Sequence, residues 1–165
     1  MNIRLQQTLL NRYPKFLRKS ADARAFDERG FECEGGWFKI IDELCSVCEA
    51  EIDTLTTQGF DRSQWPRVAQ IKEKLSSLRF RATGAVSGEL RERFLAAQEI
   101  SLRICESCGL PKSPNEQGCI DTFCESCQLD NANISMDTNV LSSAPGSTRL
   151  QHRELILAML LLRSS

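Results

Sequence analysis

Apolar residues recur at helical spacing in three stretches of the chain. They predict amphipathic helices over residues 2–12, 37–56 and 88–104. The first helix should end at Tyr13-Pro14, because the residue before a proline avoids helical backbone angles. The apolar face of the second is formed by Trp37, Ile41, Leu44, Cys48, Ile52 and Leu55. That of the third is formed by Leu90, Phe94, Ala97, Ile100 and Ile104.

The stretch over residues 67–83 fits two patterns. As a helix it would place Ile71, Leu75 and Leu78 on one face. As a β-hairpin its strands would meet across a turn at Ser76-Ser77, a poor pair for a two-residue hairpin turn. Propensity alone therefore favours a helix here.

The C-terminal part has a different character. Residues 131–148 are rich in Asn, Ser and Thr and are interpreted as a linker. Residues 149–165 predict an apolar helix containing eight consecutive apolar residues, Leu155 to Leu162. This run is far shorter than the roughly 20 residues that span a bilayer. Three roles stay open for it: docking onto the domain, pairing with a second copy or a partner, and lying at a membrane surface.

Composition sets the broad class. The chain has 165 residues, of which 41% are hydrophobic and 26% charged, as in ordinary globular proteins. Its net charge of −1 gives no overall attraction to nucleic acid. The N-terminus lacks the apolar run of a signal peptide, so we expect a cytoplasmic protein. With a short antiparallel hairpin or sheet beside the helices, the fold class is α+β.

Two C-x-x-C pairs carry the clearest chemical signal: Cys105 with Cys108, and Cys124 with Cys127. Fifteen residues separate them, a spacing typical of a four-cysteine zinc site. Four thiolates fill the tetrahedral coordination of Zn²⁺, so the ion would stabilise structure and take no part in catalysis. We therefore predict an α+β core over 1–104 and a zinc ribbon over 105–130. The alternative, two disulfides, needs an oxidising compartment.

The remaining cysteines and the single histidine suggest no catalytic site. Cys45 and Cys48 form a third C-x-x-C inside the predicted helix, where they fit a core better than a redox site. A second metal site made from these two with Cys33 and Cys119 is the alternative. One histidine, His152, cannot serve as both the ligand and the base of a metal nuclease. We therefore expect that the protein is not an enzyme.

A basic strip surrounds Phe80, and on a hairpin its charges would gather on one surface able to meet phosphates or an acidic protein. The alternative is an ordinary solvated face. The residues of this strip are Arg67, Lys72, Lys74, Arg79 and Arg81.

Four segments also occur in a characteristic order: Tyr13-Pro-Lys-Phe-Leu-Arg18, Gly36-Trp-Phe-Lys-Ile-Ile-Asp-Glu-Leu-Cys45, Gln70-Ile-Lys-Glu-Lys-Leu-Ser-Ser-Leu-Arg-Phe80 and Cys105-Glu-Ser-Cys-Gly109. Together they resemble a group of small bacterial and bacteriophage proteins that end in a zinc-ribbon-like cysteine cluster. The resemblance implies a β-hairpin at 67–83, although this chain has Ser76-Ser77 at the turn and Arg81 where an aromatic residue is expected. It implies a phage or mobile-element origin and no mechanism.

Two functions follow as hypotheses. The first is a non-catalytic, zinc-binding interaction protein of phage or prophage origin that inhibits or redirects a host protein. It is consistent with the missing catalytic groups, with the balanced charge and with an apolar tail that could also form a homodimer. The second is a nucleic-acid-binding or regulatory protein that uses the basic strip over 67–81.

Overall fold

The computed structural model describes residues 1–17, 29–112 and 121–134. Residues Met1–Cys124 form one compact unit, and Glu125 begins a second. In the described part of the first unit, a three-stranded sheet is combined with helices, so the predicted α+β class is confirmed. Cys119, His152, residues 135–148 of the predicted linker and the predicted tail helix lie outside the described residues.

The helices begin and end close to the predicted limits. Helix α1 covers Ile3–Arg12 and starts at Asn2, whose side chain accepts the Arg4 amide, a usual N-cap. A 3₁₀ turn, η1 (Gly35–Trp37), leads into α3 (Phe38–Thr57). Helix α4 covers Gly88–Ser101, three residues shorter than predicted. It ends early because Ile104 leaves the helix to form a β-bridge with Pro111.

Residues 67–83 form a hairpin, so the helix that propensity favoured is wrong there. Strands β2 (Arg67–Lys74) and β3 (Ser77–Thr83) pair antiparallel, with Ile71 opposite Phe80. The turn is Leu75-Ser76, one residue earlier than expected. Both turn residues have positive φ angles, 53° and 60°, as in a type I′ turn, whose twist matches that of the paired strands.

The sheet is mixed, whereas the sequence predicted an antiparallel one. A short strand, β1 (Phe31–Glu32), pairs parallel with β2, and the strand order is β1-β2-β3. Helix α3 connects β1 to β2, as a parallel pair requires a crossover. Strand β3 is therefore an edge strand.

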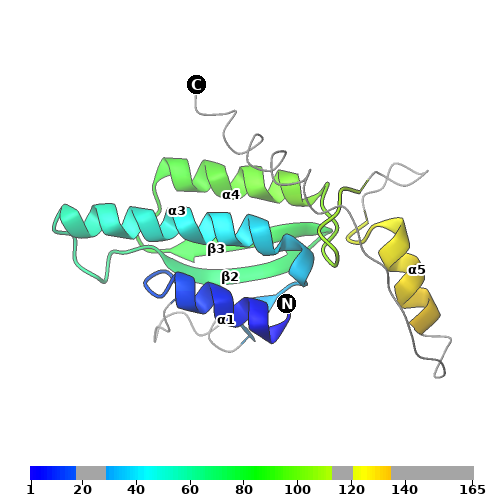
Figure 1. Ribbon diagram of the computed structural model, residues 1–165. Coiled ribbons are helices and arrows are strands. Elements are labelled where there is room, and N and C mark those ends of the chain that lie inside the picture. The colour runs from blue at the N-terminus through cyan, green and yellow to red at the C-terminus, as the bar shows by residue number, and fades with distance from the viewer. Residues whose placement is uncertain (18–28, 113–120, 135–165) are drawn as a thin grey trace. The chain divides into compact units, whose positions relative to one another are not determined.

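The core lies between the sheet and the helices α3 and α4, which run side by side over one face of the hairpin (Figure 1). Phe80 from β3 contacts Phe94 of α4, with ring centroids 5.0 Å apart, and stacks on Phe16 at 5.8 Å. The predicted face of α3 is buried from Trp37 to Ile52. The inner side of β2 and β3 is buried against the helices. The basic residues of the hairpin therefore lie on the opposite, outer face of the sheet.

Candidate metal centre

The two cysteine pairs come together. The sulfur atoms of Cys105, Cys108, Cys124 and Cys127 all lie within 4.8 Å of one another. The sulfurs of Cys108 and Cys124 are 3.6 Å apart, much farther than the roughly 2.05 Å of a disulfide. A tetrahedron with metal–sulfur bonds of about 2.3 Å has sulfurs about 3.8 Å apart, close to this separation. These four thiols could therefore hold one metal ion.

The first pair sits on a closed backbone turn. The Gly109 amide donates to the Cys105 carbonyl at 2.9 Å, and the Cys105 amide donates to the Leu110 carbonyl at 2.8 Å. Gly109 has a φ of 75°, a left-handed angle that glycine adopts without steric cost. The Cys124 amide donates to the Cys105 sulfur at 3.2 Å, so the backbone at the second pair is held against the first pair.

This turn is anchored to the start of α3. The Gly36 amide donates to the Glu106 carbonyl at 2.6 Å, and the Glu34 amide donates to the Glu106 carboxylate at 2.9 Å. The indole N–H of Trp37 donates to the Ile104 carbonyl at 2.9 Å. Three hydrogen bonds thus connect the candidate metal-binding turn (residues 104–110) to the turn that opens α3. The site is therefore integrated with the core.

Gly36 is required at this contact for steric reasons. A Cβ there would overlap the backbone oxygens of Cys105 and Glu106 and the amide of Gly109. In the sequence, Gly36 is noted only as the first residue of the segment that leads into the helix predicted over 37–56. A glycine directly before the aromatic start of a helix was the available signal, but its partners Cys105 and Glu106 lie 69 and 70 residues away along the chain.

Lys112 joins the segments that carry the two pairs. Its ammonium group donates to the backbone carbonyls of Asp121 and Thr122, which lie shortly before Cys124. Burial lowers the pKa of Lys112, while the neighbouring Cys105 opposes this shift. A cation beside four thiolates also offsets part of the negative charge that they would bring together.

The other described cysteines are core residues. Cys33, Cys45 and Cys48 are all buried, and burial raises the pKa of Cys33 to about 12. Burial also raises the pKa of Cys45 and of Cys48, which disfavours the thiolates that metal binding or redox exchange needs. Within residues 1–17, 29–112 and 121–134, the four-cysteine cluster is the only group of three or more His, Cys, Asp or Glu side chains placed to hold a metal ion.

The structure gathers four members of the basic strip on the outer face of the hairpin. Lys72 lies opposite Arg79, and Lys74 and Arg81 occupy the next positions on the same face of their strands. Lys74 and Arg81 are exposed, while Lys72 and Arg79 are half-buried. Arg67 lies at the far end of β2, opposite Thr83 and beyond a bulge. Four of the five residues of the predicted strip therefore share one face of the hairpin.

No known protein family, curated protein or solved structure matches this chain. Over the part of the chain that the structure describes, no helix has the length and apolar character needed to cross a membrane.

Proposed function

We propose that this protein is a zinc-stabilised, non-catalytic interaction protein that binds an acidic partner protein through the outer face of its β-hairpin. The proposed partner is a host protein in the cytoplasm, and the proposed origin is a phage or prophage, in line with the family resemblance. Zinc suits the donor set because four thiolates with tetrahedral reach are its usual structural site.

The observation that carries this proposal is the shared face of Lys72, Lys74, Arg79 and Arg81. None of these four side chains forms an ion pair within the described residues. The register places Lys72 directly across from Arg79, and like charges in that position destabilise a sheet by a few tenths of a kcal/mol or more. An anionic partner would relieve this repulsion and would be steered toward the face.

A protein suits this face better than a nucleic acid does. Single-stranded nucleic acids usually stack their bases on exposed aromatic rings. The only aromatic residue of the hairpin, Phe80, is buried on the opposite side of the sheet. The basic face does contain enough cations for phosphate contacts, so nucleic-acid binding is the second candidate.

Metal content is the first quantity to measure. Native mass spectrometry of the purified full-length chain should show one zinc ion per chain, and it reports the oligomeric state in the same spectrum. A chain without metal, or with the masses of disulfide-bonded cysteines, would refute the zinc assignment.

The partner face is tested by charge reversal with a matched control. The double variant Lys72→Glu/Lys74→Glu reverses two charges on the face. Lys39→Glu/Arg103→Glu makes the same change in net charge at two exposed residues outside the hairpin. Partner proteins recovered with the wild type from bacterial cytoplasm should be lost with the first variant and kept with the second. Equal recovery of partner proteins with both variants would refute the proposed role of this face.

Nucleic-acid binding is measured on the same three proteins with duplex DNA and single-stranded RNA. If nucleic acid were the partner, affinity would fall steeply with salt, and the slope would decrease in Lys72→Glu/Lys74→Glu. That result, without a protein partner, would favour the second candidate.

A further inference from the structure

We infer that the open edge of β3 binds an extended acidic segment of the partner, which adds to the sheet as a fourth strand. This inference rests on the proposed function and identifies the form in which the acidic partner is recognised.

The edge of β3 is closed at one end and open at the other. A two-residue hairpin turn makes Lys74 and Ser77 a hydrogen-bonded pair, so alternation directs the backbone groups of Leu78 and Phe80 away from β2. The Leu78 amide is satisfied by the Ser101 hydroxyl of α4 at 2.8 Å. The next outward-facing groups, those of Phe80, have no such partner from α4 among the described residues. Among the described residues, the edge is therefore unpaired at Phe80.

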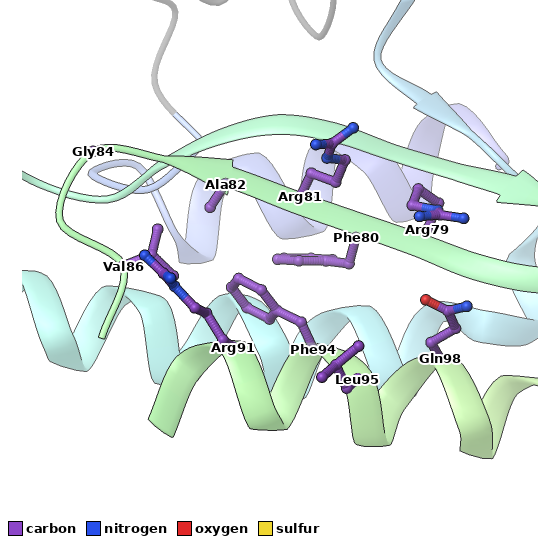
Figure 2. Close-up of a pocket in the computed structure, with 10 residues that line it drawn as sticks. All are labelled: Arg79, Phe80, Arg81, Ala82, Gly84, Val86, Arg91, Phe94, Leu95 and Gln98. Carbon is purple, nitrogen blue, oxygen red and sulfur yellow. The ribbon is translucent and has the colours of Figure 1, made fainter. Parts of the chain in front are cut away.

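A groove of about 390 Å³ lies beside this open edge, between β3 and α4. Figure 2 shows the rings of Phe80 and Phe94 packed against each other at the groove, with Leu95 next to Phe94 on α4. Leu95 is 62% exposed and presents a large apolar side chain beside the edge strand. Apolar side chains of an added strand could be buried here.

Three arginines line the same groove: Arg79 and Arg81 from β3, and Arg91 from α4 (Figure 2). No acidic residue lines it. The Nε atom of Arg79 is buried and has no hydrogen-bond partner among the described residues, which is a costly state. The groove is therefore complementary in charge to an acidic ligand.

Strand alternation determines which side chains the ligand should have. Arg79 and Arg81 point to the outer face, while Phe80 between them points to the core side. A strand added next to β3 would place every second side chain beside these arginines, and the others over Phe94 and Leu95. The matching sequence alternates acidic and apolar residues. Main-chain hydrogen bonds to the edge would supply affinity, as in other cases of strand addition.

A second copy of this chain fits the edge less well. Pairing of two β3 edges would bring the Arg79 and Arg81 side chains of both copies close together, and like charges across strands are destabilising. Arginines on an edge strand also discourage such self-association.

The test uses the zinc-loaded full-length protein and a nine-residue peptide that alternates Glu or Asp with Val or Ile. A control peptide carries N-methyl groups on alternate amides, which removes the donors of its pairing edge. Binding is followed by calorimetry and by amide hydrogen exchange at Phe80. We expect binding of the first peptide with slower exchange at Phe80, and binding weakened at least about tenfold by N-methylation.

Two substitutions locate the site. Leu95→Glu should weaken peptide binding by about tenfold or more, because it adds a repelling carboxylate and removes the apolar wall. Ile3→Glu makes the same exchange at an exposed position of α1 and should leave binding unchanged. Since both residues are exposed, neither variant should fail to fold.

Absence of binding, equal binding of the N-methylated peptide, or insensitivity to Leu95→Glu would each overturn the inference. So would dimerisation of the chain through β3 or a preference of this edge for oligonucleotides. If the host-protein complex survives Leu95→Glu but is lost in Lys72→Glu/Lys74→Glu, the edge inference fails while the proposed function stands. If both variants keep the complex, both fail.

Discussion

Replacement of Gly36 by alanine should destabilise the fold and the metal site together. The new methyl group would overlap the backbone oxygens of Cys105 and Glu106, neither of which can turn aside as a flexible side chain could. The metal-binding turn would have to move away from the start of α3. Because the metal-binding turn and the helix start are hydrogen-bonded to each other, we expect loss of stability and loss of metal affinity in one variant.

The magnitude follows from three contributions. Forced backbone displacement by an inserted methyl group costs about 1–3 kcal/mol. The hydrogen bond from the Gly36 amide to the Glu106 carbonyl, 2.6 Å long, contributes about 1 kcal/mol. Alanine also reduces the conformational freedom of the unfolded chain, which stabilises the folded state by about 0.4–1 kcal/mol. The net loss is about 1–4 kcal/mol, a substantial part of the roughly 5–15 kcal/mol that stabilises a typical domain.

Urea unfolding of the metal-loaded protein measures this loss, and competition with a chromophoric chelator measures metal affinity. Gly88→Ala is the matched control, since a Cβ at this first residue of α4 would have nothing within 4 Å. It should be neutral or stabilising by up to about 1 kcal/mol. If Gly36→Ala behaved like Gly88→Ala in both assays, the close contact between the metal-binding turn and the core would be refuted.

Three further variants or titrations probe other parts of the structure. Ser101→Ala should lower the free energy of unfolding, measured in urea, by about 1–3 kcal/mol, because the buried Leu78 amide loses its hydrogen-bond acceptor. Tyr13, the one tyrosine, should ionise at about pH 12 by ultraviolet titration, because burial and its bond to Asp42 raise its pKa. Cys45→Ser should lower the free energy of unfolding by about 2 kcal/mol, because it places a hydroxyl group in the core. The metal content should stay unchanged.

Each of these has a contradicting result. Ser101→Thr keeps the hydroxyl, so equal losses in the Ala and Thr variants would mean that the hydrogen bond is unimportant. For Tyr13, the folded pKa lies above the ordinary value of about 10, so the unfolded chain loses its proton first and stability falls as pH rises from about 10 to 12. An apparent pKa near 10 in the folded protein would contradict this. Loss of metal in Cys45→Ser would assign Cys45 to a metal site.

Local sequence was sufficient to predict several elements. The stop predicted at Tyr13-Pro14 is where α1 ends, and the apolar spacing from Trp37 to Ile52 is the face that α3 buries. The two C-x-x-C pairs were recognisable from their spacing, and the structure brings their sulfurs together. These predictions succeeded because a proline stop, helical apolar spacing and paired ligands act over a few residues, within which the sequence pattern is the physical cause.

The hairpin illustrates where local pattern is insufficient. Ile71 and Leu78 lie seven residues apart, a separation that suits one face of a helix, and the turn pair Leu75-Ser76 adopts positive φ angles that neither residue favours. The strand conformation is selected because β2 pairs with β1 along one edge and because Ile71, Leu78 and Phe80 are buried beneath the helices. Both causes involve residues distant in the chain.

The sequence by itself therefore determined the helix registers and the four metal-ligand candidates. Only the tertiary structure decided that Gly36 packs on the metal-binding turn and that Arg91 of α4 joins Arg79 and Arg81 around the open edge of β3. The physical reason is that close backbone approach and charge clustering depend on how separate elements pack. Local propensity contains no information about which distant segment lies beside a given residue.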